Sequence, residues 1–350
     1  MTGCIYHPLF EEHGLPGHPE NGRRLAAIVA RLRSSGLWDE LAHLEFGAAT
    51  VEEIAWVHDP DYVEYVHLLS EHGGGALDAD TFATAQTYRA ATLAAGGCLA
   101  ATRAILAGDI ANGLCLVRPP GHHALPHQGM GFCFFNNVAL AAEAARRAGL
   151  RRVAILDFDV HHGNGTQEIF YSRGDVLYFS VHQSPLFPGT GSVDEVGLDG
   201  GLGTTINLPL PEGAGDDHYL RAWQEVAIPA LYRFQPEIVF MSAGYDPHWR
   251  DPLAGMQMTA DGFYHLVQGT MAAAADLCAG RLLVVLEGGY DLPALALAVE
   301  NTVLALLGAG VREADSSPPP LPPEQDHRIN RYLEHAIELH RLRLQLDQAD

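Results

Sequence analysis

The sequence predicts an α/β fold in which a mostly parallel β-sheet is buried between helices. Five continuous apolar runs have the length of strands, and each is followed by Gly, Pro or polar residues. Segments with helical periodicity lie between these runs. Strands buried on both faces form unbroken apolar runs, whereas strands with one solvated face alternate. A chain of 350 residues can form one large domain of this class or two of ordinary size.

The elements follow from these patterns in order along the chain. Helical periodicity predicts helices over residues 21–36, 81–109 and 136–150. The apolar runs predict strands over residues 113–118, 152–160, 176–182, 237–244 and 281–289. Residues 316–323 form a stiff proline-rich connector. The last segment, 324–350, has apolar residues at helical spacing, and we expect a helix that packs on the body or on another subunit of a homo-oligomer.

Charge and cysteine content narrow the class of protein. With 43 acidic and 21 basic residues the formal net charge is −22 at pH 7, which argues against nucleic acid or an anionic membrane as a direct partner. The five cysteines are scattered and form no CxxC pair, which is typical of reduced thiols. The N-terminus does not resemble a signal peptide, and no segment approaches the roughly 18 uncharged apolar residues of a membrane span. We therefore expect a cytoplasmic protein.

Chemically active side chains follow each predicted strand. The strands lead into RPPGHH, DVHHGNG, SVHQ, AGYD and EGGYD, so these residues gather at the carboxyl edge, where α/β sheets bind ligands. Asp159 and His161 project to the same side of a strand end, and Asp246 is the best third ligand. Two carboxylates and one imidazole suit a catalytic Zn²⁺ with a position left for water. Iron(II), cobalt and manganese accept the same ligand types, and His162 fits a structural role.

Two further motifs supply groups for catalysis. His122 and His123 lie in a loop after the first predicted strand, and imidazole titrates near neutral pH, as a general base and an electrostatic helper must. Tyr290 follows two glycines, and a phenol can donate a hydrogen bond to a developing oxyanion. A lone histidine or a GGY turn is usually structural. The prediction therefore depends on all these groups meeting at one edge of the sheet.

Together the motifs resemble those of the zinc-dependent histone deacetylase family, in the arginase/deacetylase superfamily. RPPGHHA, GFCFFNN, DFDVHHGNGTQ, LFPGTG, SAGYDPHWRDPLAG and EGGYDL occur in the family's order. Within the family, the chain is most similar to class II-like bacterial histone deacetylase-like amidohydrolases. The resemblance implies a deacetylase catalytic domain over residues 1–315. It also implies a central eight-stranded parallel sheet with helices on both faces.

The resemblance assigns roles to individual residues. One zinc ion would be held by Asp159, His161 and Asp246. The catalytic residues would be His122, His123, Asp157, Asn164 and Tyr290, with Asp157 orienting His122. A structural potassium ion would be bound by Asp157, Asp159, His161, Ser180 and Val181, partly through backbone carbonyls. The walls of an acyl-lysine tunnel would be formed by Gly131, Phe132, Phe187 and Leu253.

The predicted function is zinc-dependent hydrolysis of Nε-acetyl-lysine, in a protein or peptide, to lysine and acetate. Leu253 follows Asp251 and Pro252, where the eukaryotic polyamine-selective relative carries Glu, and an apolar residue there favours acyl-lysine. The acidic rim residue of several relatives has no clear counterpart, because Asp78 and Asp80 lie in a stretch that does not align with the family motifs.

Three alternatives remain open. An acetylpolyamine or other small-amide hydrolase would suit the acidic composition. A non-catalytic acyl-lysine binding module would keep the fold without needing every catalytic group. An arginase-type ureohydrolase is disfavoured, because the sequence contains one metal trio and no second cluster of bridging aspartates.

Overall fold

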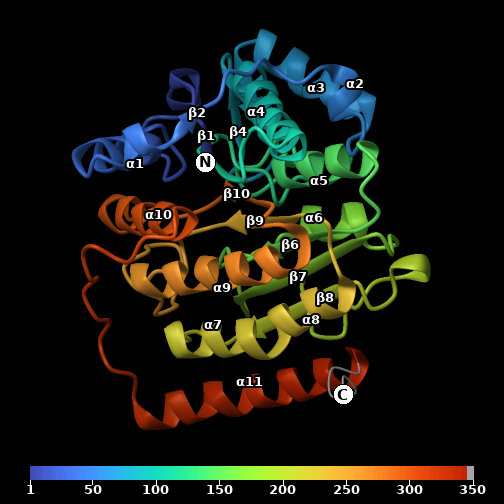
Figure 1. Ribbon diagram of the computed structural model, residues 1–350. Helices are drawn as coiled ribbons and strands as arrows, with labels where there is room; N and C mark the ends of the chain where they lie inside the picture. Colours follow the sequence, from blue (N-terminus) through green and yellow to red (C-terminus); the bar gives the residue numbers. More distant parts are fainter. Residues whose placement is uncertain (345–350) are drawn as a thin grey trace.

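A computed structural model describes residues 1–344, and its centre is an eight-stranded parallel sheet in the order β2-β1-β5-β10-β9-β6-β7-β8 (Figure 1). The sheet strands are β1 (Thr2–Ile5), β2 (Ala42–His43), β5 (Asn112–Cys115), β6 (Val153–Asp157), β7 (Val176–Gln183), β8 (Thr205–Leu210), β9 (Val239–Ala243) and β10 (Leu282–Leu286). A separate antiparallel hairpin is formed by β3 (Gly74–Ala76) and β4 (Phe82–Thr84). The predicted eight-stranded parallel sheet is confirmed.

Helices cover both faces of the sheet, as predicted. The α-helices are α1 (Arg23–Ser34), α2 (Val51–Ile54), α3 (Pro60–Glu71), α4 (Thr87–Ala107), α5 (Asn137–Arg147), α6 (Asn164–Phe170), α7 (Asp216–Ala222), α8 (Ile228–Phe234), α9 (Ala260–Cys278), α10 (Leu292–Leu306) and α11 (Pro323–Leu344). Figure 1 shows α4 and α5 on one side of the sheet and α9 and α10 on the other.

The five predicted strands are β5, β6, β7, β9 and β10, and every residue in them is buried. The parallel register places Asp157, the last residue of β6, opposite Ser180 of β7 and Ser242 of β9. This register brings the carboxyl ends of the central strands together. Sequence patterns did not reveal β1, β2 or β8, because β1 and β2 are very short and β8 contains Pro209, which an edge strand tolerates.

Two expectations about the segment 81–109 need correction. Its first residues form strand β4 rather than helix, and α4 begins only at Thr87. The expectation that no segment has the length and apolar character of a membrane span is also wrong, because α4 meets both conditions. The most apolar stretch of α4 is 67% buried inside the fold, as expected of a core helix.

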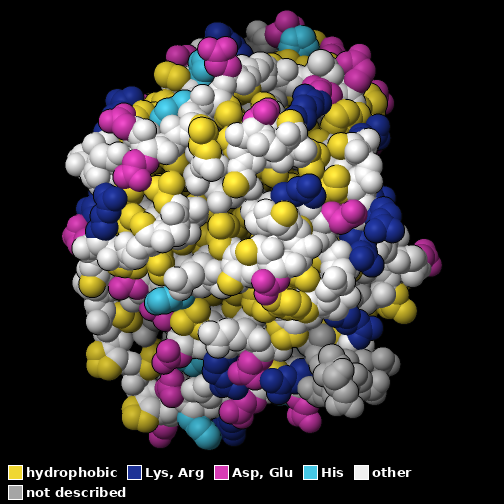
Figure 2. All heavy atoms as spheres, in the orientation of Figure 1, with side chains coloured by type: hydrophobic (Ala, Val, Ile, Leu, Met, Phe, Trp, Pro, Cys, Tyr) yellow, Lys and Arg dark blue, Asp and Glu magenta, His cyan; other side chains and the backbone are white. Residues whose placement is uncertain are grey.

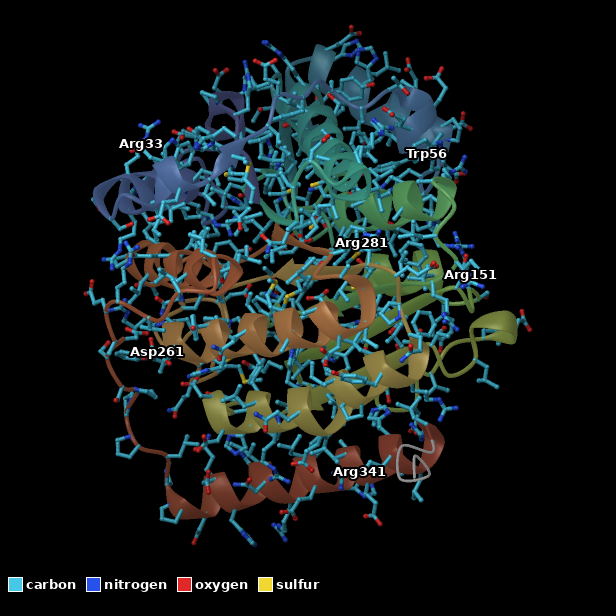
Figure 3. The ribbon with its side chains drawn as sticks, viewed as in Figure 1. Arg33, Trp56, Arg151, Asp261, Arg281 and Arg341 are labelled. Atoms are coloured by element: carbon cyan, nitrogen blue, oxygen red, sulfur yellow. The ribbon has the colours of Figure 1, made fainter. Side chains whose placement is uncertain are left out.

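The C-terminal helix packs on the body, which is one of the two predicted arrangements. It begins at Pro323 and contacts β8 and α7. Its buried residues include the five whose helical spacing in the sequence predicts this helix: Ile329, Leu333, Ala336, Ile337 and His340. Arg341, labelled in Figure 3, pairs with Glu225 at 3.1 Å. Residues 345–350 of the predicted helix lie outside the described residues.

Candidate active site

The three predicted metal ligands lie together at the carboxyl edge of the sheet. Asp159 and His161 follow β6, and Asp246 follows β9, the strand that pairs with β6. Nδ1 of His161 is 3.1 Å from Oδ1 of Asp159 and 3.2 Å from Oδ2 of Asp246. One ligand atom from each residue lies within 4.8 Å of the other two, so a single cation can contact all three.

The space around these ligands fits an ion. Oδ2 of Asp246 is buried and accepts no hydrogen bond of good geometry within residues 1–344, and a buried, unsatisfied carboxylate oxygen is costly. A Cβ at Gly244 would come within 1.9 Å of Oδ2 of Asp159, and one at Gly288 within 2.1 Å of Oδ2 of Asp246. Glycine therefore keeps this space open, and the donor set fits a catalytic zinc ion.

Buried carboxylates make this edge of the sheet strongly negative. Burial by itself would lower the pKa of His161, but Asp159 and Asp246 raise it to about 10. Burial and the charge of Asp159 raise the pKa of Asp246 above its ordinary value. The field that draws a proton to His161 also draws a cation, and a divalent ion satisfies both carboxylates at once.

His122 is surrounded by acidic groups. Its Nδ1 lies 3.1 Å from Oδ2 of Asp157, and its Nε2 lies 3.8 Å from Oδ2 of Asp159. The backbone N–H groups of Gly121 and His122 donate to Oε2 of Glu287 at 2.7 and 3.2 Å. Burial would lower the pKa of His122, but Asp159, Asp157 and Glu287 raise it to about 10. The ring therefore carries a positive charge at neutral pH.

His123 has the opposite electrostatic environment. Burial and the positive charges of His122 and His161 hold its pKa well below the ordinary value. Nδ1 of His123 lies 2.8 Å from Oδ1 of Asn164. An amide oxygen can only accept, so Nδ1 carries the proton and Nε2 keeps a free lone pair. The two adjacent histidines therefore differ in charge, although their ring centroids are only 4.0 Å apart.

Tyr290 follows β10 and lines the same cavity as Asp159 and His161. Burial raises the pKa of Tyr290 well above its ordinary value, so the hydroxyl stays protonated and can donate. The guanidinium of Arg24 lies 5.0 Å from the centre of the tyrosine ring. Arg24 is fully buried and donates to the carbonyls of Glu287 at 2.5 Å and Gly289 at 2.7 Å. Sequence reasoning missed Arg24, because the two carbonyls to which it donates are more than 260 residues away.

The predicted tunnel residues line a cavity of about 210 Å³ above these groups. The ring of Phe187 lies 5.1 Å from that of His123, and Leu253 and Phe132 also line the cavity. Gly131 is required by space, because a Cβ there would come within 2.4 Å of the His123 ring and 2.9 Å of Phe187. Phe132 has a φ of 69°, a left-handed conformation that is rare for aromatic residues and occurs where backbone strain serves a site.

The two acids of the unaligned stretch take different positions. Asp80 lines the cavity. Asp78 turns its carboxylate into its own loop, where Oδ1 accepts the backbone N–H groups of Asp80 and Thr81 at 3.0 and 2.6 Å. Asp80 is therefore the acid at this rim, and burial together with Asp78 raises its pKa.

The residues of the predicted potassium site also converge. Asp157 and Ser180 are register partners, Val181 follows Ser180 on β7, and all three are buried. Asp159 and His161 follow Asp157 at the same end of β6. Potassium binding itself stays a prediction.

Both ring nitrogens of His162 have hydrogen-bond partners in the protein. Nδ1 lies 2.8 Å from the hydroxyl of Thr190, and Nε2 lies 3.0 Å from Oε1 of Gln167. Because both nitrogens have protein partners, the geometry supports the structural role.

Sequence reasoning also missed Glu287, the acid of EGGYD. It is fully buried, and burial raises its pKa to about 7. With His122 and Cys133 it forms a second group of clustered ligand atoms. Both oxygens of Glu287 already accept hydrogen bonds, one of them from Ser242 at 3.2 Å, so this group holds the histidine loop in place. The available signal was an acidic residue directly after a buried strand.

The fold and the site define a metal-dependent hydrolase built on a parallel sheet. Its carboxyl edge carries a metal trio, a charged and a neutral histidine, and a tyrosine around a narrow cavity.

The chain belongs to the histone deacetylase family, because the family model of the histone deacetylase domain matches residues 18–306. It is 44% identical to the histone deacetylase-like amidohydrolase of Pseudomonas aeruginosa over 305 residues, 86% of this chain and 78% of the relative. It is 41% identical to human polyamine deacetylase HDAC10 over 314 residues, 86% of this chain and 45% of that protein. The crystal structure of the HDA15 HD domain matches with a TM-score of 0.87 and 35% identity, covering 99% of this chain and 96% of the other.

Proposed function

We propose that this protein is a zinc-dependent deacetylase that hydrolyses Nε-acetyl-lysine in peptides or proteins to lysine and acetate. The observation that carries the proposal is the geometry of the site, in which His122, paired with Asp157, and His123, whose Nδ1 faces the amide of Asn164, lie beside the trio Asp159, His161 and Asp246. A non-catalytic binding module would need the tunnel, but it would not need two histidines that differ in charge.

The tunnel suits an extended acyl-lysine. The walls at Phe132 and Phe187 would contact the aliphatic stem, and the acyl carbonyl would reach the trio at the floor. Zinc held by the trio supplies Lewis-acid chemistry, since it polarises the carbonyl and lowers the pKa of water toward neutrality.

The two histidines have different roles in the reaction. His123 accepts the proton of the attacking water on Nε2 and then delivers it to the leaving lysine amine. The amide oxygen of Asn164 fixes the tautomer of His123. Because this amide is uncharged, it does not hold the proton that His123 takes up on Nε2, and that proton can pass to the leaving amine. His122, held charged by Asp157 and Asp159, stabilises the negative charge that develops on the substrate.

Tyr290 completes the site by donating a hydrogen bond to the tetrahedral oxyanion. Loss of one such donor typically costs about 10² to 10³ in rate. The buried Arg24 beside its ring and the cavity-lining position of Tyr290 support this role.

We also propose the predicted potassium ion at Asp157 and Ser180. A monovalent cation there would offset part of the charge of the buried carboxylates without competing for the zinc ligands. The pairing of the two residues across β6 and β7 supports this placement.

Lysine substrates are favoured over polyamines by Leu253, which lines the cavity. An apolar residue tolerates the neutral backbone of a peptide, but it gives no partner to the secondary ammonium of an acetylpolyamine. The alternative, an acetylpolyamine hydrolase, is supported by the similarity to HDAC10 and by the acidic surface. Figure 2 shows acidic side chains scattered among basic ones on the visible face. The net charge of −22 attracts cationic substrates of either kind.

The cytoplasm is the compartment we propose. The five cysteines are all free and buried, as expected in a reducing environment.

A substrate panel tests the proposal. Zinc-loaded protein is incubated with acetyl-lysine peptides, longer acyl-lysine peptides, acetylspermidine and arginine, and acetate, free amine and urea are measured. All 21 basic residues of the chain are arginine, so new ε-amines come only from the substrate. We expect the highest kcat/KM for acetyl-lysine peptides, loss of hydrolysis with a chelator, and recovery with zinc.

Each other outcome selects a different function. A higher kcat/KM for acetylspermidine would assign the protein to polyamine metabolism. Binding of the peptide without release of acetate would support the binding module, and production of urea would support a ureohydrolase.

A further inference from the structure

Asp251 joins two segments of the candidate active site that come from different strands. It lies on the segment that follows β9 and carries Asp246, and its side chain reaches the segment that follows β10. Oδ2 of Asp251 accepts the backbone N–H groups of Tyr290 at 2.6 Å and Asp291 at 3.4 Å, and Oδ1 accepts that of Leu253 at 3.0 Å. One carboxylate thus contacts the backbone at both Tyr290 and the cavity-lining Leu253.

Burial shows that this contact is more than a surface turn. Asp251 is only 6% exposed, and a carboxylate in that position is stabilised by donors that point at it. Within residues 1–344, all three donors to Asp251 are backbone N–H groups, so the contact fixes the position of the main chain and not of a particular side chain.

Tyr290 needs such an anchor because two glycines precede it. Gly289 has a φ of 114°, and a Cβ there would come within 3.0 Å of Leu295 and Tyr245. Glycine lets the chain make this turn but leaves it flexible. The hydrogen bond from Tyr290 to Asp251 restricts the chain directly after the flexible pair.

The segment that carries Asp251 is itself held firmly. Nε2 of His248 lies 2.7 Å from Oδ2 of Asp315, and both side chains are buried. Trp249 donates from its indole nitrogen to the carbonyl of Ser316 at 3.1 Å. The connector after α10, outside the matched family domain, therefore fixes the segment from which Asp251 reaches Tyr290.

We propose that Asp251 is a positioning residue that sets Tyr290 relative to the metal ligands, and so places the hydroxyl where the oxyanion forms. This inference rests on the proposed function. A displacement of about 1 Å at a reacting group can cost about 10²-fold in rate, so a lost backbone anchor has a measurable effect.

A double-mutant cycle tests the inference. Asn at residue 251 keeps one acceptor oxygen but turns an NH₂ group toward a backbone donor. We expect Asp251→Asn to lower kcat about ten- to a hundredfold, with KM raised at most about threefold and zinc content unchanged. In the Tyr290→Phe background, where the hydroxyl is already missing, the same change should alter kcat by less than about twofold.

Asp216→Asn is the matched control. Asp216, in α7, is partly buried and accepts a backbone N–H at 2.8 Å from Thr259 rather than from Tyr290. Its replacement should leave kcat unchanged in both backgrounds. Asp251→Ser, which keeps a single short acceptor, should reproduce the loss seen with Asn.

Several outcomes would overturn the inference. The first is a wild-type kcat in Asp251→Asn. The second is an equal loss of kcat when Asp251→Asn is made in the Tyr290→Phe background. The third is loss of folding or of zinc in both Asp251→Asn and Asp251→Ser, which would show that the carboxylate has a structural role. Full activity of Tyr290→Phe would also refute the inference, because the tyrosine hydroxyl would then not need to be positioned. Failure of the proposed function is distinct, since the wild type would then be inactive on every acylated substrate.

Discussion

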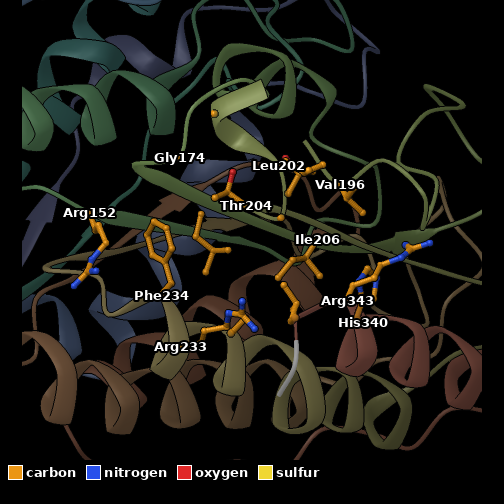
Figure 4. A pocket seen from close by; sticks show the side chains of 16 residues that line it. Arg152, Gly174, Val196, Leu202, Thr204, Ile206, Arg233, Phe234, His340 and Arg343 are labelled. Carbon is orange, nitrogen blue, oxygen red and sulfur yellow. The ribbon is translucent and has the colours of Figure 1, made fainter. Parts of the chain in front are cut away.

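Two cavities lie at opposite ends of the same strands and differ in both size and chemistry. The cavity at the carboxyl edge measures about 210 Å³, and its lining includes Asp159 and His161 of the candidate metal trio, His122, His123 and Tyr290. The cavity at the amino edge measures about 700 Å³ and lies between β6–β8, α8 and α11 (Figure 4). Its lining combines apolar side chains with Arg152, Arg233 and Arg343, and no acidic residue of the described chain lines it.

The difference shows that the size of a cavity does not identify a catalytic site in this fold. Residues that precede the strands, such as Arg151 and Arg281 in Figure 3, are exposed or partly exposed basic groups. Residues at or just after the carboxyl ends of the strands include Asp157, Asp159 and Asp246, which are fully or almost fully buried. Buried charge persists only where protein partners or a cation compensate it. The buried carboxylates, rather than the size of the cavity, therefore identify the carboxyl edge as the candidate site.

The largest effect is expected from replacing Asp246, the proposed metal ligand that follows β9. Asp246→Ala should abolish hydrolysis and zinc binding while the protein stays folded, as measured by metal content and thermal unfolding. The matched change Asp175→Ala, at the amino end of β7, removes a carboxylate that pairs with Arg146 and Arg173. That variant should keep both zinc and kcat. Stoichiometric zinc in a fully active Asp246→Ala protein would refute the ligand assignment.

A smaller effect concerns substrate choice at the mouth of the carboxyl-edge cavity. Leu253→Glu should shift the kcat/KM ratio toward acetylated polyamines by about tenfold, because one charge-assisted hydrogen bond is gained. Leu202→Glu makes the same substitution in the lining of the amino-edge cavity and should leave the ratio unchanged. An unchanged ratio in Leu253→Glu would mean that another residue selects the substrate.

The smallest effect is expected at the arginines of the amino-edge cavity. Arg233→Ala should leave kcat/KM within about twofold and the free energy of unfolding within about 0.5 kcal/mol, as is usual for an exposed side chain. Steady-state kinetics and denaturant unfolding measure both. A loss of activity above about tenfold would show that the two edges are coupled, and would contradict the conclusion that only the carboxyl edge serves catalysis.

Local sequence was sufficient for the central strands and for the residues that follow them. Asp159 and His161 are two residues apart at the end of one apolar run, so their common direction follows from strand geometry. Asp246 could be placed beside them because carboxyl ends of parallel strands meet at one edge. The edge strand β8 escaped detection because Pro209 interrupts its pattern, and a helix prediction over 81–109 overlooked β4 because Phe82–Thr84 pairs with a segment earlier in the chain.

What the sequence determined by itself is therefore the fold class, the gathering of ligands and histidines at one edge, and the family. Only the tertiary structure decided how these groups differ in charge and position. His122 and His123 are neighbours of the same type, yet Asp157 and Asp159 hold one charged while burial keeps the other neutral. Likewise, Asp251 acquires its role from a backbone N–H that lies 39 residues away. Burial and distances between remote segments set these properties, and neither is encoded in a short stretch of sequence.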